Sequence, residues 1–407
     1  WHYPEVGPIA DPNDQQSVRE REEQGIGVYP RNAFTWQRLN HRNAVQRPWD
    51  RKRPLWIGET YFYSGKVSRQ AWIGGDAAMS GRPAADRASA EFIDMLTRGY
   101  RWNDVAGINI FTPANKIPGT GVKRSMAPVA VFSRDYEHHF RAGEALTRRL
   151  KVFNDWLVDA EFTLAWQLAH GKKILREGTQ GLTVKAGHNE DVLLEIDLPA
   201  DIEGRIDGTL TLRLLYRDDE QFVEQHPVSI FGPIRPVQPG DLQVLTIDPA
   251  GTVMARLDDW GWQYEAATMP TREGGQGMLA IIGPNALREN PEIMLKRLLA
   301  LAENGARILI LEQDAPYPDG ILPFKLGRRA AAGAYAWPRG NHPALRGIRK
   351  NDLQLWGRGQ VVFRHPFLRS PEWPLLVDAS ARAELPLAPV VQLPFGKGRL
   401  LLSPLLV

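Results

Sequence analysis

The hydrophobic pattern of this chain changes character twice, near residues 128 and 240, and this constrains the fold more than any other feature. Before the first change, short apolar runs alternate with loops rich in Gly, Pro and Arg. Between the two changes apolar and polar residues alternate, and after the second the apolar runs are nearly continuous. Each pattern is typical of a different sheet architecture. Because a chain of 407 residues is also too long for one core, we expect about three domains.

The first stretch, up to about residue 125, contains the elements of a parallel βα unit. Residues 55–58 predict a short buried strand that ends at Glu59. A helix is expected next, because four apolar residues recur at the spacing of one helical face: Ala88, Phe92, Met95 and Leu96. Gly99 stands where the C-terminal cap of that helix would lie. Residues 105–111 predict a second strand, and strand, helix, strand in this order indicates parallel pairing.

The middle stretch predicts a β-sandwich of immunoglobulin type. Residues 162–168 and 210–214 alternate with period two, and turn sequences separate such segments at short intervals. Packing alone must hold the two sheets together, because the chain contains no Cys that could form a disulfide. The prolines of residues 233–239 predict a stiff linker after the sandwich.

The last stretch predicts a doubly wound α/β domain of the flavodoxin or amidotransferase type. Residues 242–247, 278–282 and 307–311 are apolar runs of the kind that is covered on both faces of a sheet. A helix is expected at 291–304, with Asn290 as its N-cap and Gly305 after its C-terminus. The expected domains are therefore residues 1–125, 126–233 and 234–407. The fold class is α/β plus all-β.

Composition excludes several classes of function. Lys and Arg number 50 against 47 Asp and Glu, so no strong field favours a nucleic acid. No apolar run approaches the roughly 20 residues that cross a bilayer. The adjacent His138 and His139 suggest a metal site, but neighbouring side chains on a strand point apart and no carboxylates accompany them. We therefore expect no metal and no cofactor.

Glu59 is the strongest candidate for chemistry. A carboxylate at the C-terminal end of a strand faces the active site when that strand belongs to a (β/α)8 barrel. There it can attack the anomeric carbon of a sugar, provided that a second carboxyl group about 5–5.5 Å away protonates the leaving oxygen. The structural alternative is a carboxylate that pairs with a nearby arginine such as Arg51 or Arg53.

The segment Arg53-Pro-Leu-Trp-Ile-Gly-Glu59-Thr-Tyr61 resembles the seventh barrel strand of a clan of retaining glycosidases. The clan includes the family 2 and family 42 β-galactosidases and agarase-like enzymes. The opening residues 1–4 resemble the end of strand six of that barrel, and residues 107–111 take the place of strand eight. This resemblance implies that Glu59 is the nucleophile.

Further site residues follow from the same resemblance. Tyr3 is implied as the hydrogen-bond partner of the nucleophile, and His2 as a contact of a sugar hydroxyl. Tyr61 and Phe111 are implied as parts of the pocket wall. The family's acid/base Glu stands in an Asn-Glu pair at the end of strand four, and no such segment precedes Trp1. Only about the last 115 residues of a barrel of roughly 250 are present, so we expect the chain to be a piece of a longer enzyme and catalytically incomplete by itself.

The rest of the chain also resembles this family. Residues 128–155 resemble the entry into the sandwich that follows the barrel in family 2-like enzymes. Residues 281–283 and 395–402 resemble parts of the glutamine-amidotransferase-like domain of some β-galactosidases. A true amidotransferase needs a Cys nucleophile, which this chain lacks. The resemblance therefore implies a structural role for this domain, or a role in assembling a homo-oligomer.

Two hypotheses of different classes remain. The first is a retaining glycosidase that acts on β-linked carbohydrate, at work in the periplasm or outside the cell. The alternative is a non-catalytic protein that binds carbohydrate or assists assembly, in which the barrel segment is inert.

Overall fold

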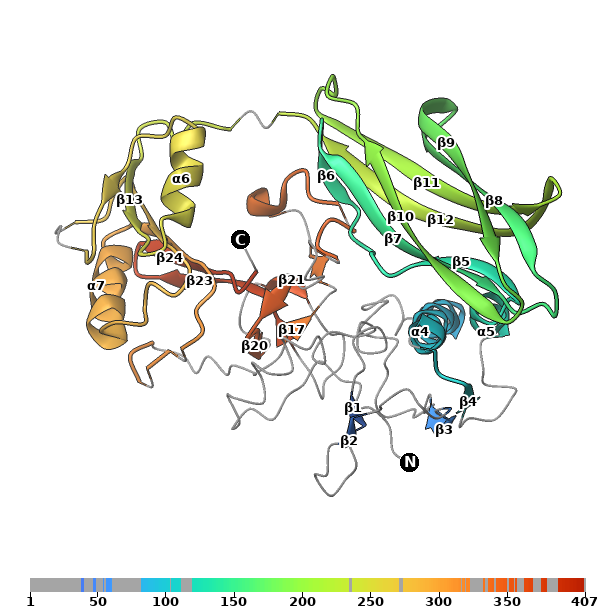
Figure 1. Cartoon of the computed structure of the whole chain (residues 1–407). Helices are drawn as coiled ribbons and strands as arrows, with labels where there is room; N and C mark the ends of the chain where they lie inside the picture. Colours follow the sequence, from blue (N-terminus) through green and yellow to red (C-terminus); the bar gives the residue numbers. More distant parts are fainter. Residues whose placement is uncertain are drawn as a thin grey trace.

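The computed structural model describes only part of the chain. The described residues are 38–39, 47–48, 54, 56–60, 82–102, 104–110, 119–233, 236–270, 274–315, 317–318, 320–322, 332–333, 336–339, 342–349, 351–354, 356, 362–368, 375–378 and 387–405. They form a mixed α/β structure that is rich in sheet and has few helices. Figure 1 shows a two-sheet sandwich (β5–β12) on one side and an α/β unit (β13–β24) on the other.

The described N-terminal elements contain the expected βα unit. Strand β3 (Trp56–Thr60) pairs in parallel with β4 (Gly107–Ile110), and helix α4 (Arg82–Trp102) lies between them in the sequence. A short helix, α5 (Gly119–Ser125), follows β4 and packs beside α4. Two strands of two residues each, β1 (Arg38–Leu39) and β2 (Arg47–Pro48), pair antiparallel.

Helix α4 is longer than the sequence predicted, and the prediction that Gly99 ends it is wrong. Gly99 is buried within the helix, which continues to Trp102. The left-handed residue that ends it is Asp104, with φ 59°. The Asp104 and Val105 amides donate to the carbonyls of Arg101 and Tyr100, which is the Schellman pattern. Packing of the last turn outweighs the intrinsic cost of a glycine, about 1 kcal/mol.

The sandwich consists of eight strands: β5 (Val129–Ser133), β6 (His139–Arg141), β7 (Ala145–Asn154), β8 (Ala160–His170), β9 (Lys173–Val184), β10 (His188–Asp197), β11 (Arg205–Tyr216) and β12 (Asp219–Phe231). One sheet has the order β10-β7-β5 and the other the order β6-β12-β11-β8-β9. Every pair is antiparallel except β6 with β12, which is parallel. The two sheets share one hydrophobic core.

Alternation with period two places one face of each long strand in that core. In β8, Phe162, Leu164 and Leu168 are at most 2% exposed, whereas Glu161, which precedes Phe162, is exposed. Strand β5 is buried along its whole length because the core covers one face and α4 the other. The predicted strand segments 162–168 and 210–214 are therefore both present, within longer strands.

The α/β unit has one mixed sheet of eight strands. Its elements are β13 (Gln243–Ile247), α6 (Thr252–Asp259), β14 (Glu265–Ala266), β15 (Met278–Ile282), α7 (Pro291–Glu303), β16 (Arg307–Ile310), β18 (Trp337–Pro338), β21 (Leu375–Asp378), β23 (Val390–Phe395) and β24 (Gly398–Leu402). The order is β14-β13-β15-β16-β24-β23-β21-β18. The first five strands are parallel, and the remaining pairs are antiparallel.

Helices cover both faces of the parallel half of this sheet. Helix α6 packs on the face that carries Val244 and Ile281. Helix α7 packs on the opposite face, where Leu245 and Ile282 lie. The chain winds in both directions from β13, which has β14 on one side and β15 on the other. Because helices cover both faces of the sheet here, strands β13, β15 and β16 read as continuous apolar runs in the sequence.

Helix α7 confirms the predicted helix at 291–304 to within one residue. Asn290 occupies its N-cap, but its side chain makes no capping hydrogen bond, so that part of the prediction is wrong. Gly305, with φ 107°, ends the helix as predicted. The amides of Gly305 and Ala306 donate to the carbonyls of Ala302 and Leu301.

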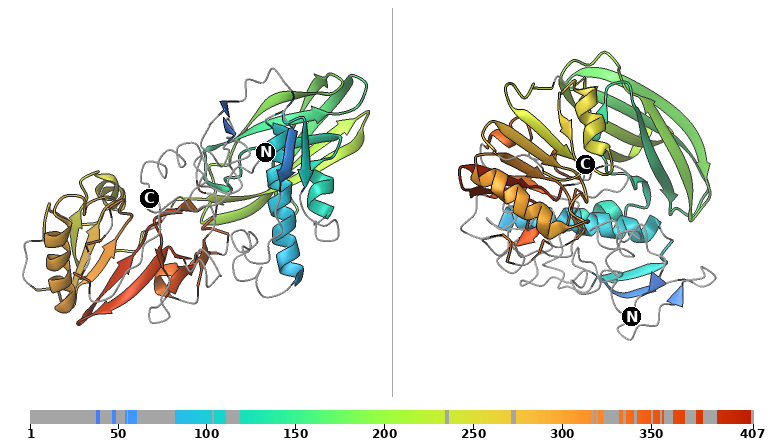
Figure 2. Two further views of the ribbon diagram at one scale, coloured as in Figure 1. Left: turned by 90° about the horizontal axis from the view of Figure 1, so that it is seen from below. Right: turned by 90° about the vertical axis from the view of Figure 1, so that its left-hand side faces the viewer.

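Smaller elements complete the unit. They are β17 (Ala332–Gly333), β19 (Phe363–Arg364), β20 (Phe367–Leu368), β22 (Leu387–Ala388) and a 3-10 turn, η2 (Pro343–Leu345). Figure 2 shows an elongated arrangement, with the sandwich and the α/β unit at opposite ends. The domain limits expected from the sequence remain a prediction.

Candidate functional site

Glu59 lies at the C-terminal end of β3, one residue before the strand ends. Ile57 is opposite Ile108 and Thr60 is opposite Ile110, so two residues of β3, Gly58 and Glu59, face one residue of β4. This is the residue count of a β-bulge. Bulges are frequent next to active sites because they change the direction of a side chain and end the pairing.

Helix α4, which connects β3 to β4, is anchored to the sandwich by a buried charge cluster, defined as Asp94, Arg98, Glu224 and His226. The guanidinium of Arg98 donates to Glu224 Oε1 at 2.5 Å and to Asp94 Oδ2 at 2.9 Å. His226 Nε2 lies 3.1 Å from the same Glu224 oxygen. Arg98 and Glu224 are each 2% exposed. Arg98 also lies 4.6 Å above the ring of Phe132 in β5.

Charge pairing keeps Glu224 and Arg98 of this cluster ionised. Burial opposes ionisation of Glu224, but the Arg98 guanidinium and His226 outweigh it and lower the pKa of Glu224 to about 2. Burial raises the pKa of Asp94, and the same arginine only partly opposes that rise. The pKa of Arg98 is raised, because Glu224 and Asp94 outweigh the effect of its burial.

Arg101 ties the end of α4 to the sandwich. It donates to the carbonyls of Ser125 and Ala127 at 2.8 and 3.0 Å and pairs with Asp155 at 2.9 Å. Its guanidinium lies 4.5 Å from the ring centre of Phe153. The helix between the parallel strands β3 and β4 is thus held to the sandwich at two successive turns, which fixes the position of the unit that carries Glu59.

Of the site residues predicted from the sequence, only Glu59 lies among the described residues. Glu59 is placed by its backbone within β3. His2, Tyr3, Tyr61 and Phe111 lie outside the described residues. Their roles, and the role of Glu59, therefore stay predictions.

His138 and His139 correct a sequence expectation. The sequence predicted that these side chains point apart on a strand, but only His139 belongs to β6. The two rings are in contact, with their centroids 4.0 Å apart and their planes tilted by 44°. Among the described residues no group of three or more His, Cys, Asp or Glu could hold a metal ion.

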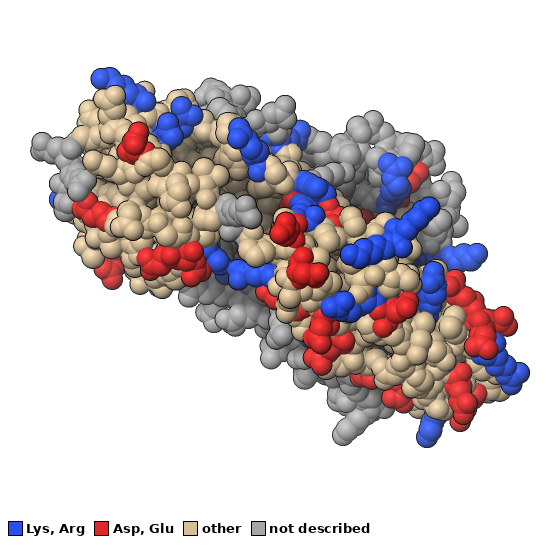
Figure 3. Space-filling view, turned by 90° about the horizontal axis from the view of Figure 1, so that it is seen from above, with Lys and Arg blue, Asp and Glu red and all other residues tan. Residues whose placement is uncertain are grey.

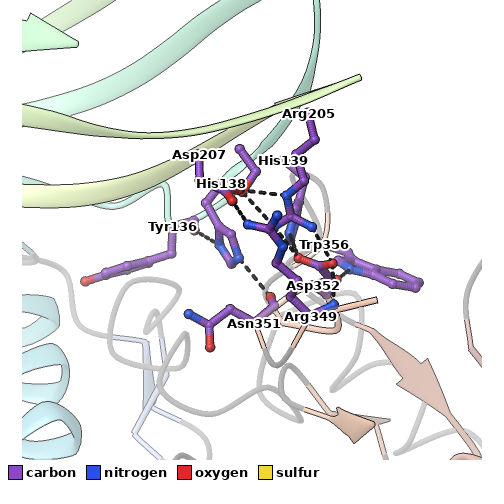
Figure 4. Close-up of polar contacts among 10 residues, drawn as sticks. Tyr136, His138, His139, Arg205, Asp207, Arg349, Asn351, Asp352 and Trp356 are labelled. Carbon is purple, nitrogen blue, oxygen red and sulfur yellow. Dashed lines mark hydrogen bonds and ion pairs between the residues drawn. The ribbon is translucent and has the colours of Figure 1, made fainter. Parts of the chain in front are cut away.

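These histidines belong to an interdomain cluster, defined as His138, His139, Arg205, Asp207, Arg349 and Asp352 (Figure 4). Arg205 in β11 binds Asp352 of the α/β unit through two hydrogen bonds of 2.7 Å. It also donates to Asp207 at 2.8 Å, and Asp207 pairs with Arg349. The main-chain amide of Arg349 donates to Asp352 at 2.7 Å.

His138 and His139 also contact residues of the α/β unit. His138 Nε2 lies 3.0 Å from the carbonyl oxygen of Asn351, and Nδ1 lies 3.4 Å from that of Tyr136. His139 Nε2 lies 3.7 Å from Asp352 Oδ1, beyond hydrogen-bond distance. Burial and the neighbouring His138 lower the pKa of His139 to about 4, although Asp352 opposes this. Burial also lowers the pKa of His138.

Sequence reasoning missed both charge clusters. Arg98 and Glu224 are 126 residues apart in the chain, and Arg205 and Asp352 are 147 apart. One signal was available, because charged residues at inward positions of period-two strands need partners. Glu224 alternates with the buried Phe222 and His226 on β12 in this way.

The face of the molecule that Figure 3 shows has no extended region of one charge among the described residues. Basic and acidic side chains are interspersed over this face. No helix in the described part of the chain is long and apolar enough to cross a membrane. The expectations about nucleic acid, carbohydrate and oligomer formation stay predictions.

Comparison with known proteins gives only weak structural similarity. No family model matches the chain, and no curated protein matches it. One similar solved structure is a β-D-mannosidase from Dictyoglomus thermophilum, with 14% identity, TM-score 0.28, and coverage of 35% of this chain and 19% of the mannosidase. Another is a cycloisomaltooligosaccharide glucanotransferase from Paenibacillus sp., with 13% identity, TM-score 0.21, and coverage of 46% of this chain and 28% of the other.

A third similar structure is the periplasmic chaperone SfaE, with 10% identity, TM-score 0.20, and coverage of 29% of this chain and 66% of the chaperone. The matched region thus spans less than two thirds of each of these three chains. TM-scores this low give no argument for a shared fold or a shared activity.

Proposed function

We propose that this chain carries the nucleophile of a retaining glycoside hydrolase, and that Glu59 is that nucleophile. One observation carries the proposal. Glu59 stands at the C-terminal end of β3, at a shift in register, in a parallel β3–α4–β4 unit. In barrels built from such units, catalytic groups come from this end of the strands.

The chemistry needs two carboxyl groups. The Glu59 carboxylate attacks the anomeric carbon, and the bond to the leaving oxygen breaks as a second carboxylic acid protonates that oxygen. Water, activated by the same second group, then hydrolyses the covalent glycosyl–enzyme. We assign the second carboxyl group to a segment upstream of Trp1, at the end of the fourth barrel strand, and His2, Tyr3, Tyr61 and Phe111 to the sugar pocket.

The sandwich and the α/β unit are non-catalytic in this proposal. An immunoglobulin-like domain has the strand order A-B-E in one sheet and A′-G-F-C-C′ in the other. With β5, β7 and β10 as A, B and E, and β6, β12, β11, β8 and β9 as A′, G, F, C and C′, this order accounts for both sheets and for the parallel β6–β12 pair. An amidotransferase-like ancestry accounts for the parallel half of the second sheet, and the absence of Cys leaves it without the nucleophile of that chemistry. The substrate class is β-linked carbohydrate, and the protein acts in the periplasm or outside the cell.

Replacement of Glu59 tests the nucleophile in the protein translated from the complete reading frame. A panel of 4-nitrophenyl β-glycosides serves as the probe. Glu59→Ala lowers kcat by at least about a thousandfold, because no covalent intermediate forms. Sodium azide then restores turnover and yields a glycosyl azide of inverted configuration. Glu161→Gln, a change at an exposed carboxylate of β8, leaves kcat unchanged. Full activity of Glu59→Ala would overturn the proposal.

The coding DNA upstream of the Trp1 codon distinguishes the enzyme from the alternative, a carbohydrate-associated binding or assembly protein. An open frame that encodes further strand-like segments and an Asn-Glu pair supports the enzyme. A start codon and signal peptide directly before Trp1 support the binding protein.

A further inference from the structure

The sandwich and the α/β unit are connected twice. The covalent connection is the segment between β12 and β13, residues 232–242. The second connection is the interdomain cluster, which joins strands β6 and β11 to Arg349 and Asp352, more than 100 residues beyond that segment (Figure 4). A second connection of this kind fixes the relative orientation of two units that one linker alone would leave free to turn.

On one side the cluster lies next to a hydrophobic core, and on the other side it lies in a strand of the sandwich. On the α/β side, Leu353 follows Asp352 and is 2% exposed in a core with Val377 and Val390. The Ala336 amide donates to the Leu353 carbonyl at 2.8 Å, and Trp356 Nε1 donates to the Asp352 carbonyl at 2.5 Å. On the other side, Arg205 lies in β11. The cluster therefore joins a segment next to the hydrophobic core of the α/β unit to a strand of the sandwich.

The charges of the cluster balance only while the histidines are neutral. Asp207 and Asp352 offset Arg205 and Arg349, so a proton on either histidine leaves one uncompensated positive charge. The centroids of the two imidazole rings are 4.0 Å apart, so a charge on one ring opposes a charge on the other.

Other charged groups reach the histidines from each element packed on them. Arg148 of β7 acts on His138, and Arg205 of β11 acts on His139. Both influences disfavour a proton. Asp352 acts on both histidines and favours one. Ser229 of β12 is the register partner of His139 and carries no charge. Tyr136 stays neutral because burial raises its pKa.

We propose that the interdomain cluster is an acid-labile clamp, which holds the α/β unit on the sandwich at neutral pH and releases it when the adjacent histidines take up protons. The function belongs to this contact and is independent of the role of Glu59.

The sign of the effect follows from proton linkage. In the closed state the pKa of His139 is about 4, whereas an exposed histidine in the released state titrates near 6.5. The released state therefore binds more protons between these values. The clamp is fully stable above pH 6.5 and weakens as pH falls towards 4. The lowered pKa values of His138 and Asp352 act in the same direction.

Small-angle X-ray scattering of the full chain at pH 7.5, 5.5 and 4.5 tests the clamp. Constant ionic strength separates protonation from salt screening, and near-UV circular dichroism shows that both units stay folded. We expect a compact particle at pH 7.5 and a larger maximum dimension at pH 4.5. A particle that keeps its neutral dimensions down to pH 4.5 would overturn the proposal.

Variants assign the effect to the cluster. His139→Phe keeps a ring that can contact His138 and Phe231 but cannot titrate, so the midpoint of expansion moves down by at least about one pH unit. His188→Phe, at an exposed position of β10, is the matched control and keeps the wild-type midpoint. Arg205→Met and Asp352→Asn each give an expanded particle at pH 7.5. A wild-type midpoint in His139→Phe, or compact particles for both other variants, would contradict the clamp.

Discussion

Arg98 and Arg213 form ion pairs of similar length, but the two pairs contribute differently to the stability of the chain. Arg98 meets Glu224 at 2.5 Å with both side chains 3% exposed, whereas Arg213 meets Glu220 at 3.0 Å with both nearly half exposed. Breaking a buried pair leaves a charge without compensation, which costs about 3–5 kcal/mol. An exposed pair contributes at most about 1 kcal/mol because water screens it.

We therefore predict that Arg98→Met lowers the free energy of unfolding by about 3–5 kcal/mol and that Arg213→Met lowers it by less than about 1 kcal/mol. Chemical denaturation followed by circular dichroism measures both. Equal effects of the two substitutions would show that Arg98 is not the buried partner of Glu224.

Glu224 also sets a pH dependence. Its pKa is lowered from an ordinary 4.5 to about 2 in the folded chain, so its contribution to stability is fully present above pH 4.5 and is lost as pH falls through about 2. Denaturation curves of wild type and Glu224→Gln, measured between pH 7 and 2, should converge as the pH decreases. A constant difference between the two proteins across this range would refute the assignment.

At the scale of elements, the two glycines of strand β9 have opposite surroundings. A Cβ on Gly178 would meet Cζ2 of Trp166 at 2.6 Å, whereas a Cβ on Gly181 would meet nothing within 4 Å. Trp166 and Gly178 are register partners on β8 and β9.

Gly178→Ala should therefore destabilise the sandwich by about 1–3 kcal/mol, the usual cost of overpacking. Gly181→Ala should be neutral or slightly stabilising, because alanine restricts the unfolded chain. Thermal denaturation of both variants provides the measurement. Equal melting temperatures would mean that the Trp166 ring does not lie over Gly178.

Elements with strong local signals could be predicted from the sequence. Strand β15 has the predicted bounds, and α7 ends within one residue of its prediction, because a continuous apolar run and a Gly after the helix are local features. The end of α4 could not be predicted. Gly99 reads as a stop, but contacts of the following turn with the sandwich continue the helix, and those contacts are distant in sequence.

In the candidate site, too, local features could be predicted from the sequence and contacts between distant residues could not. Glu59 is recognisable because a buried strand that ends in a carboxylate is a local pattern, and β3 does end one residue after it. The contact between the rings of His138 and His139 could not be predicted, because it depends on where β6 begins and on the approach of Asn351 and Asp352.

At the scale of the whole molecule, the interdomain cluster should make the sandwich and the α/β unit unfold together at neutral pH. Asp352→Asn removes a charge that binds Arg205 twice. We predict that differential scanning calorimetry at pH 7.5 shows one coupled transition for wild type and two separated transitions for this variant. Asp314→Asn, which removes a peripheral pair with Arg288 at 3.9 Å, is the matched control. Two transitions in the wild type would exclude the coupling.

The proposed activity also belongs to the whole molecule. The described unit supplies a parallel β3–α4–β4 element, with α4 fixed on the sandwich by Arg98 and Arg101. A parallel sheet of two strands does not bury its own faces, so the proposed barrel needs further βα units. The 407-residue chain by itself should hydrolyse none of the 4-nitrophenyl β-glycosides.

The most direct measurement is covalent trapping of the nucleophile. The protein from the complete reading frame is inactivated with a 2-deoxy-2-fluoro-β-glycoside of a sugar that it hydrolyses, digested with pepsin and sequenced by mass spectrometry. We predict a fluoroglycosyl ester on Glu59, within the peptide that contains residues 56–60. A label on any other carboxylate, or inactivation without a covalent label, would contradict it.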